Sequence, residues 1–244
     1  MRLFKNYLVL FVLLAISSQL DAASTLITAV NIKVSVADEV RNVSGFSGIS
    51  SAGSYNVFIT MGNTESLRIE GDSEQVSQIE TVVEEGTLKI RNKQGTGGWK
   101  NQNGKVNIYV TAKSLKSIVL SGSGDIKVSG EVKSRDVSTI LSGSGNIALA
   151  IDATNYFATI SGSGGIKAKG NTENAKINVN GSGDFEGNGL RTSVTSAKMS
   201  GSGNISIQAD KALDAAMSGS GNIKFGGNAS VKSSKSGSGN ISRL

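Results

Sequence analysis

The sequence predicts an all-β protein built as a single-stranded parallel β-helix, a solenoid of about ten coils, on three observations. A six-residue stretch, Ser121 to Ile126 (Ser-Gly-Ser-Gly-Asp-Ile), returns six more times, with first residues 21, 19, 19, 20, 18 and 18 positions apart. The apolar residues around each copy alternate with polar ones, as they do in extended strands. Alternating runs also precede the first copy. At ~20 residues per coil, roughly 200 residues make about ten coils.

The first 22 residues predict a secretory signal peptide. Arg2 and Lys5 supply a positive start, an apolar segment runs from Tyr7 to Ile16, and cleavage is expected after Ser17 or near Ala22. The apolar segment is about ten residues long, whereas a membrane helix needs ~20. We therefore expect an exported protein without a membrane span, in the periplasm, on the outer-membrane surface or outside the cell. A retained anchor is the alternative.

The rest of the chain divides into a lead-in and one domain. Residues 23–42 are expected to hold one strand, because Ile32, Val34 and Val36 alternate strictly. Residues 43–244 are expected to form the β-helix, with irregular coils over 43–116 and strict repeats over 117–244. Gln75 to Glu85 spaces its apolar residues almost as a helix does, but its β-branched content favours strand or irregular structure. The strand-like runs of the irregular part are Tyr55–Ile59, Leu67–Ile69, Thr87–Ile90 and Val106–Val110.

Gly95 to Gly104 is a polar, glycine-rich loop that holds the only tryptophan, Trp99. An exposed tryptophan beside Lys100 and Asn101 would contact a sugar ring or a protein partner. The alternative is that Trp99 packs back onto the nearest sheet edge, as large aromatic residues commonly do.

In the strict repeats, the columns of apolar residues lie at odd-numbered positions relative to the start of each copy. Counted from the first residue of each copy, offsets of minus three, minus one, plus five and plus seven are mostly apolar, and an extended chain points them to one face. That face must be the interior. The serines at zero and plus two, and the Asn or Asp at plus four, then point outward. The two glycines permit backbone angles closed to other residues, so each copy is predicted to turn a corner.

Stacking of coils places like residues above like on the outside, as ladders of Ser and of Asn or Asp. Two interpretations stay open. The side chains hydrogen-bond along the stack and stabilise the corner, or they present a flat polar face to a glycan or a partner protein. Lys167 and Glu186 occupy one outward column in successive copies and are expected to pair. The candidate interaction surface comprises Ser121, Ser123, Ser144, Asn146, Ser202, Asn204, Asn222 and Trp99.

Enzyme chemistry has little support in the sequence. His and Cys are both absent, which removes the commonest general base and common metal ligands. Asp184 and Glu186 lie two apart on one extended face and would be the carboxylate pair of a glycoside-cleaving site, but a solvated acidic corner is the favoured interpretation. Calcium-binding repeats carry a recurrent Asp at nine-residue spacing, whereas only Asp125 and Asp184 occur at this position here. We expect no enzyme activity, no cofactor and no metal.

The charge pattern bears on partners. The formal net charge is +6, but the basic residues are spread along the chain without a cluster, so no nucleic-acid partner is expected. Lys235 and Arg243 occupy columns that are apolar in other copies, and charges there discourage edge-to-edge strand addition. The alternative is a homo-oligomer that forms through the open coil end.

Four segments together resemble the head GIN domain family. They are Glu39 to Ile49, Gly53 to Val57, Gly86 to Ile90, and Leu120 to Gly124. The resemblance covers about residues 38–244. That family is a domain of unknown function labelled an auto-transporter adhesin, and it implies a right-handed parallel β-helix in an exported protein of Gram-negative bacteria. It supplies no catalytic or ligand residues, and we expect no translocating barrel in this sequence.

The sequence thus favours an exported, non-enzymatic β-helix that acts in adhesion or surface interaction with glycans or other macromolecules. Two alternatives stay open. One is a carbohydrate-active enzyme that uses surface carboxylates, and the other is a periplasmic structural or signalling scaffold.

Overall fold

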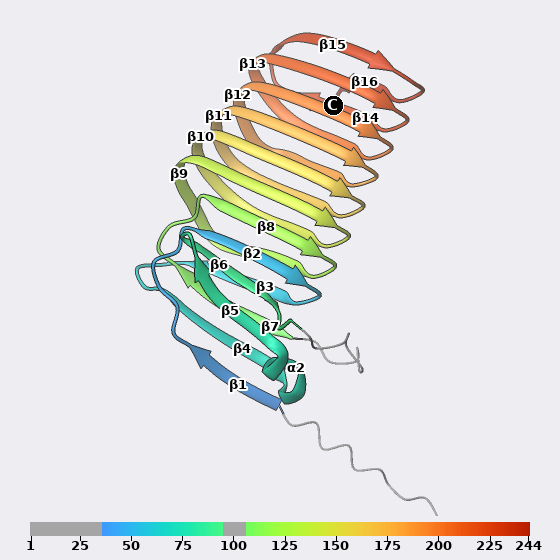
Figure 1. Cartoon of the computed structure of the whole chain (residues 1–244). Coiled ribbons are helices and arrows are strands. Elements are labelled where there is room, and N and C mark those ends of the chain that lie inside the picture. The colour runs from blue at the N-terminus through green and yellow to red at the C-terminus, as the bar shows by residue number, and fades with distance from the viewer. Residues whose placement is uncertain (1–35, 95–105) are drawn as a thin grey trace, which may run out of the picture. The chain divides into compact units, whose positions relative to one another are not determined.

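The described part of the chain is a nearly all-β solenoid (Figure 1). In this computed structural model, residues 36–94 and 106–244 are described. The predicted fold class is confirmed, although the solenoid has about 7 turns where the sequence suggested about ten. The predicted signal peptide, most of the predicted lead-in strand and Trp99 lie outside the described residues. Within those residues, no helix has the length and apolar character needed to cross a bilayer.

The strict repeats form the regular part of the stack. Each coil from β9 to β13 is one long strand that follows a full circuit and is interrupted only at the Ser-Gly corner, and consecutive coils pair in parallel. The strands of this part are β8 (Ser117–Gly122), β9 (Asp125–Gly143), β10 (Asn146–Gly162), β11 (Gly165–Gly181), β12 (Asp184–Gly201), β13 (Asn204–Gly219), β14 (Asn222–Gly226), β15 (Ser230–Ser236) and β16 (Asn240–Arg243).

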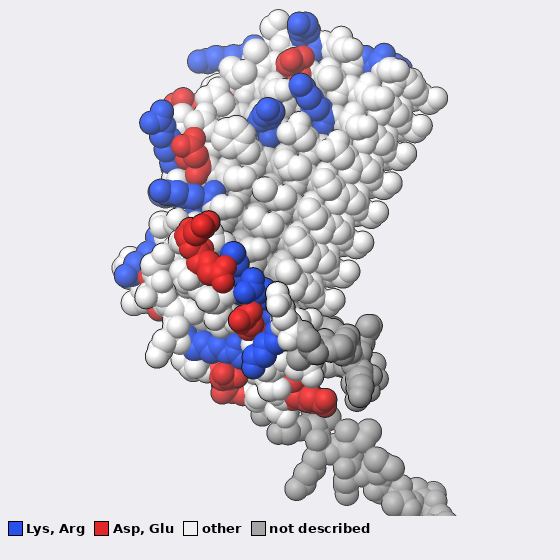
Figure 2. Space-filling view, in the orientation of Figure 1, with Lys and Arg blue, Asp and Glu red and all other residues white. Residues whose placement is uncertain are grey.

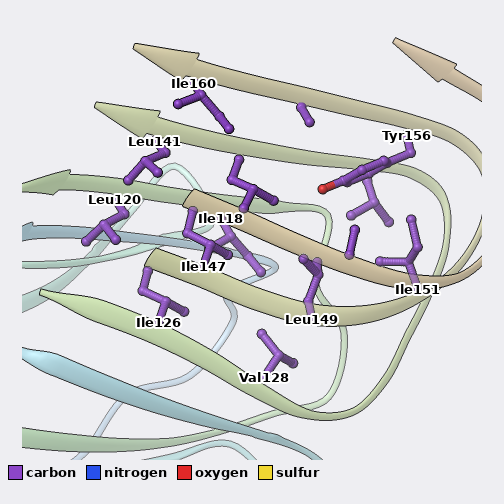
Figure 3. Close-up of a cluster of buried hydrophobic side chains, with 14 of the residues drawn as sticks. Ile118, Leu120, Ile126, Val128, Leu141, Ile147, Leu149, Ile151, Tyr156 and Ile160 are labelled. Carbon is purple, nitrogen blue, oxygen red and sulfur yellow. The ribbon is translucent and has the colours of Figure 1, made fainter. Parts of the chain in front are cut away.

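The register of the parallel strands lays each repeat over the one before it. Ile126 pairs with Ile147, which pairs with Ile166, and Leu120 pairs with Leu141. All five side chains are buried, and Figure 3 shows Leu120, Ile126, Leu141 and Ile147 directed into the space between the walls of the coil. The prediction that the apolar residues at odd offsets point into the interior is therefore confirmed. Burial of such columns, at roughly 25 cal/mol per Å² of apolar surface, is the main stabilising contribution to the stack.

The first coil lies well before the strict repeats in the chain. It consists of β2 (Gly48–Gly53) and β3 (Asn56–Met61), which pair in parallel with β8 and β9 on one side. On the other side they pair in parallel with β6 (Thr87–Asn92) and β7 (Asn107–Ala112). The chain therefore forms the first coil with β2 and β3 and then builds the N-terminal end of the stack with the segments up to β7. It returns to the other side of the first coil at β8.

An N-terminal cap closes that end. We use this name for β1 (Val36–Arg41), β4 (Ser66–Asp72), α2 (Ser73–Gln78) and β5 (Ile79–Glu84). Here β1 pairs with β4, β4 with β7 and β5 with β6, and all three pairs are antiparallel. The expectation of irregular coils over 43–116 therefore holds only in part, and this accounts for the smaller number of turns.

Helix α2 corrects the expectation for Gln75 to Glu85. Residues 75–78 are helical, because the Asp72 side chain accepts hydrogen bonds from the backbone N–H groups of Glu74 and Gln75 and so caps a single helical turn. Residues 79–84 form a strand, as their β-branched content predicted.

Candidate interaction surface

The repeated motif forms a corner where consecutive coils approach very closely. The first glycine of each copy has a positive φ, for example +134° at Gly143, which confirms the predicted turn. A Cβ on Gly143 would lie only 2.3 Å from the carbonyl oxygen of Gly122 in the preceding coil. A Cβ on Gly145 would lie 1.8 Å from the carbonyl oxygen of Gly124. The glycines are therefore required by contact between coils as well as by the turn.

The backbone amides of the corner are satisfied by the preceding coil. The N–H groups of Ser144 and Gly145 both donate to the carbonyl of Gly122, at 3.0 and 3.2 Å. The same pair of hydrogen bonds joins Ser163 and Gly164 to Gly143. These amides are thus used within the stack and are not available to hold an anion.

The predicted serine columns lie on the surface. Ser121, Ser123, Ser144 and Ser202 are all exposed, and they follow the corner from coil to coil. No hydrogen bond holds these four hydroxyl groups within the described part of the chain, so they are open to a partner.

The asparagines form a hydrogen-bonded ladder. Asn146 donates both its backbone N–H and its side-chain Nδ2 to Oδ1 of Asp125, each at 2.9 Å. Asn204 donates in the same way to Asp184, at 2.8 and 2.9 Å, and Asn222 donates from Nδ2 to Oδ1 of Asn204 at 3.0 Å. For this column the structural interpretation of the ladder is supported, because these bonds use the amide groups that a ligand would otherwise contact.

The ladder has a direction that the sequence did not reveal. Asn146, Asn204 and Asn222 donate toward the preceding coil, and a carboxylate, which can only accept, stands first in the runs that begin at Asp125 and Asp184. Gly165 interrupts the column between these two runs. The column also extends into the first half of the chain, since Asn56 donates to Asn107 at 3.3 Å. The alignment of Gly53–Val57 with the repeat was the signal for this extension.

Asp184 and Glu186, the carboxylates of the enzyme alternative, border a hollow of about 330 Å³ beside Gly165. Asp184 accepts from Asn204, and Glu186 pairs with Lys167 at 2.7 Å between Nζ and Oε2. The predicted Lys167–Glu186 pair is therefore confirmed. Both carboxylates already have structural partners, and a general acid or base must instead be placed to exchange a proton with its substrate. Within the described residues, no group of three or more acidic side chains is arranged to hold a metal.

Charged residues reach over the core at the last coil. Lys235 donates from Nζ to the carbonyl of Gly239 at 3.0 Å. Arg243 donates to the carbonyl of Gly227 and lies 5.5 Å from the centre of the Phe225 ring. These two side chains place positive charge over columns that are apolar in other coils. Their role against strand addition stays a prediction.

One outward region was missed by sequence reasoning. It lies where β8 and the last residues of β9 and β10 form the front sheet of Figure 1, and Figure 2 shows it free of charged side chains. Ile140 and Phe157 are 37% and 44% exposed there, on adjacent strands. Apolar residues at outward offsets were the available signal. We call this region the uncharged face, and its outward residues are Ser117, Val119, Ser121, Ser138, Ile140, Ser142, Phe157, Thr159 and Ser161.

Solved structures share the fold. A "putative adhesin" from Bacteroides fragilis is 25% identical, with a TM-score of 0.81, covering 86% of this chain and 97% of that chain. A "putative lipid binding protein" from Parabacteroides distasonis is 26% identical, with a TM-score of 0.70, covering 86% and 96%. A "putative adhesin" from Parabacteroides merdae, 19% identical with a TM-score of 0.64 over 86% and 96%, is similar in fold alone.

No curated protein matches this chain. A family model described as "Putative auto-transporter adhesin, head GIN domain" matches residues 45–229, which include the first coil, part of the cap and most of the repeats. The chain belongs to the head GIN domain family.

Proposed function

We propose that this protein is an exported, non-enzymatic adhesion protein that contacts a macromolecular surface through its uncharged face. The observation that carries the proposal is a three-by-three grid of outward residues on adjacent strands. It contains six hydroxyl side chains and three apolar ones, and no charge. Membership in a family described as an adhesin supports the same conclusion.

The composition of the uncharged face suits a neutral partner. Apolar side chains exposed together in a patch mark interaction sites. Ile140 lies at the centre of the grid, and Phe157 lies at its corner, between Ser138 and Lys176 of β11. The hydroxyl groups of the grid can each donate and accept. The serine columns of the corner, which include Ser121, continue along the edge of this face. A glycan or a protein surface of low charge would meet both kinds of group.

Binding of purified protein to intact cells and to immobilised glycans tests the proposal. Ile140→Lys and Ser142→Lys place charge on the uncharged face at outward positions, so they should leave the thermal midpoint nearly unchanged and lower binding at least tenfold. Ser129→Lys is the matched control, because Ser129 is exposed on a different wall of the coil and has no hydrogen bond to lose within the described residues. Equal binding by all three variants would refute the assignment.

Export and location remain part of the proposal. Protease accessibility on intact cells separates a surface adhesin, which should be cleaved, from a periplasmic scaffold, which should be protected. Contact by Trp99 and a homo-oligomer through the last coil remain predictions. A Trp99→Ala variant and the sedimentation coefficient of the purified protein test them.

A further inference from the structure

A long groove runs along the second bend of the coils, at the edge opposite the Ser-Gly corner. It is shallow and open to solvent, has a volume of about 820 Å³, and is lined by residues from five consecutive strands, β9 to β13. At a strand spacing of about 4.8 Å, five strands give a groove roughly 19 Å long. Figure 2 shows charged side chains of both signs gathered along this edge, in contrast to the uncharged face.

The floor of the groove is closed by a buried column, Ala153, Thr172 and Thr192. Thr172 donates from Oγ1 to the carbonyl of Thr154 at 3.2 Å, and Thr192 donates to the carbonyl of Gln208 at 2.9 Å. The floor hydroxyls are therefore already bonded to backbone. They hold the shape of the bend and leave recognition to the walls.

The walls carry charged side chains that do not pair with one another. Among the described residues, Arg135, Asp152, Glu173, Arg191 and Asp210 form no ion pair and no side-chain hydrogen bond, and all five are exposed.

The register separates Asp152 from Arg191. Asp152 lies beside Asn171, and Asn171 lies beside Arg191, so these two opposite charges are two coils, or roughly 10 Å, apart. Lys133, which lies beside Asp152 in the preceding coil, pairs instead with Glu131. Lys167 and Glu186, in adjacent coils, do pair.

We propose that this groove binds a neutral glycan chain laid along the stack. Asp152, Asn171, Glu173, Arg191 and Asp210 each present a planar group with two hydrogen-bonding atoms, and such groups match two neighbouring hydroxyls on a sugar ring. Carboxylate and guanidinium groups make charge-assisted hydrogen bonds, which are stronger than neutral ones. Their free positions on successive coils would hold successive sugar residues.

The charges of the groove exclude other ligand classes. Asp152, Glu173 and Asp210 repel a polyanion, including a nucleic acid, whose affinity depends on neutralised phosphates. Arg135 and Arg191 repel a polycation. A peptide would bring apolar side chains, whereas the lining of this groove is mostly polar. A hydroxyl-rich chain without net charge satisfies the walls throughout.

This inference shares with the proposed function only the expectation that the protein binds a glycan, because the groove and the uncharged face are different surfaces. Variants in each surface separate the two proposals. Changes in the groove should leave binding at the uncharged face intact, and Ile140→Lys should leave binding in the groove intact.

Titration calorimetry of the purified full-length protein against laminarin, mannan and xylan oligosaccharides tests the groove. We expect saturable binding of at least one of these neutral chains, little affected by salt, and no binding of polygalacturonate. Arg191→Ala and Asp152→Ala should each lower the affinity about tenfold or more with an unchanged thermal midpoint, since neither side chain has a partner to lose. Glu173→Gln, which keeps a planar group, should lower it less than Glu173→Ala.

Lys167→Ala, outside the groove, is the matched control and should leave the affinity unchanged. The inference is overturned if the folded protein binds none of the three neutral chains. It is equally overturned if affinity survives the Asp152→Ala, Arg191→Ala double substitution, or if only polygalacturonate or a protein partner is bound.

Discussion

The N-terminal cap and the repeat stack use opposite rules for their polar side chains. In the stack, parallel strands lie in register, so a residue meets its own counterpart from the next coil. Like charges directly opposite each other are destabilising. The columns of the corner are accordingly filled by Ser and Asn, which both donate and accept, with Asp only at the start of a run.

The cap shows the other rule. Antiparallel pairing sets different residues opposite each other, so complementary charges can meet. Asp38 and Glu70 lie opposite each other across β1 and β4, and Arg68, two residues from Glu70 on β4, pairs with both carboxylates and lies 4.4 Å from the centre of the Tyr109 ring. Across β5 and β6, Arg91 pairs with Glu80 at 2.8 Å. The columns of the corner thus favour neutral hydrogen-bonding side chains, whereas the antiparallel pairs of the cap allow several ion pairs.

The largest expected loss in the free energy of unfolding comes from replacing a glycine of the stack, compared with a glycine outside it. Gly143→Ala in the stack combines a positive φ with a clash against the carbonyl of Gly122, and should cost about 4 kcal/mol or more. Gly45→Ala, before the first coil, has a φ of +76° but open space around the new Cβ, and should cost about 1–2 kcal/mol. Urea unfolding of both variants measures the difference, and equal costs would show that backbone strain alone governs the corner.

A buried hydrogen bond inside the stack should give the next largest effect. Tyr156 and Thr139 share a hydroxyl contact of 2.8 Å in the core. Tyr156→Phe leaves the Thr139 hydroxyl without that partner and should cost about 1–3 kcal/mol in the free energy of unfolding. Adding Thr139→Val should recover part of this loss. An additive double variant would contradict the coupling.

Alkaline pH should weaken the fold through buried tyrosines in both the first coil and the stack. Burial raises the pKa of Tyr55 to about 12 and raises the pKa of Tyr156 as well. The unfolded chain releases these protons near pH 10. Stability is therefore complete below about pH 10 and falls as the pH rises toward about 12.

Urea midpoints measured between about pH 8 and pH 11 test this pH dependence. Tyr55→Phe should reduce the alkaline loss, because phenylalanine has no proton to release. An unchanged slope in that variant would contradict the role of Tyr55.

The smallest effects come from exposed ion pairs. Lys167→Ala in the stack and Arg68→Ala in the cap should each lower the urea midpoint only slightly, because exposed ion pairs contribute little to stability. Arg68 should cost more, since it has two carboxylate partners and an aromatic ring. Unfolding at low salt and at ~1 M salt checks this, because salt screens both pairs and should narrow the gap. A larger loss for Lys167→Ala would reverse the comparison of the two regions.

The sequence predicted the stack well and the cap poorly, for a physical reason. Parity identified the inward columns of Leu120 and Ile126, because alternation reports which face a strand buries. The same alternation is present in parallel and antiparallel strands, so β4 and β5 could not be distinguished from coils. The pairing of Lys167 with Glu186 was predictable because both residues lie within the regular columns.

The candidate sites were harder to predict. The groove lies where repeats differ in length, and register shifts, as between Gly187 and Arg191, absorb those differences. No fixed spacing therefore connects Asp152 with Arg191 in the sequence. The uncharged face was recognised from two exposed apolar residues, Ile140 and Phe157. A sequence search for apolar residues at inward positions does not find them.

Because similar coils stack in register, the length of the solenoid can change by whole coils. Removal of residues 146–164 would join Gly145 to Gly165 and set Ile166 over Ile126 with every column still aligned. The stack would shorten by one strand spacing, about 4.8 Å. Insertion or loss of whole coils can thus move the cap and the last coil apart or together in fixed steps. The length of the stack can therefore change while the same apolar columns continue to form its core.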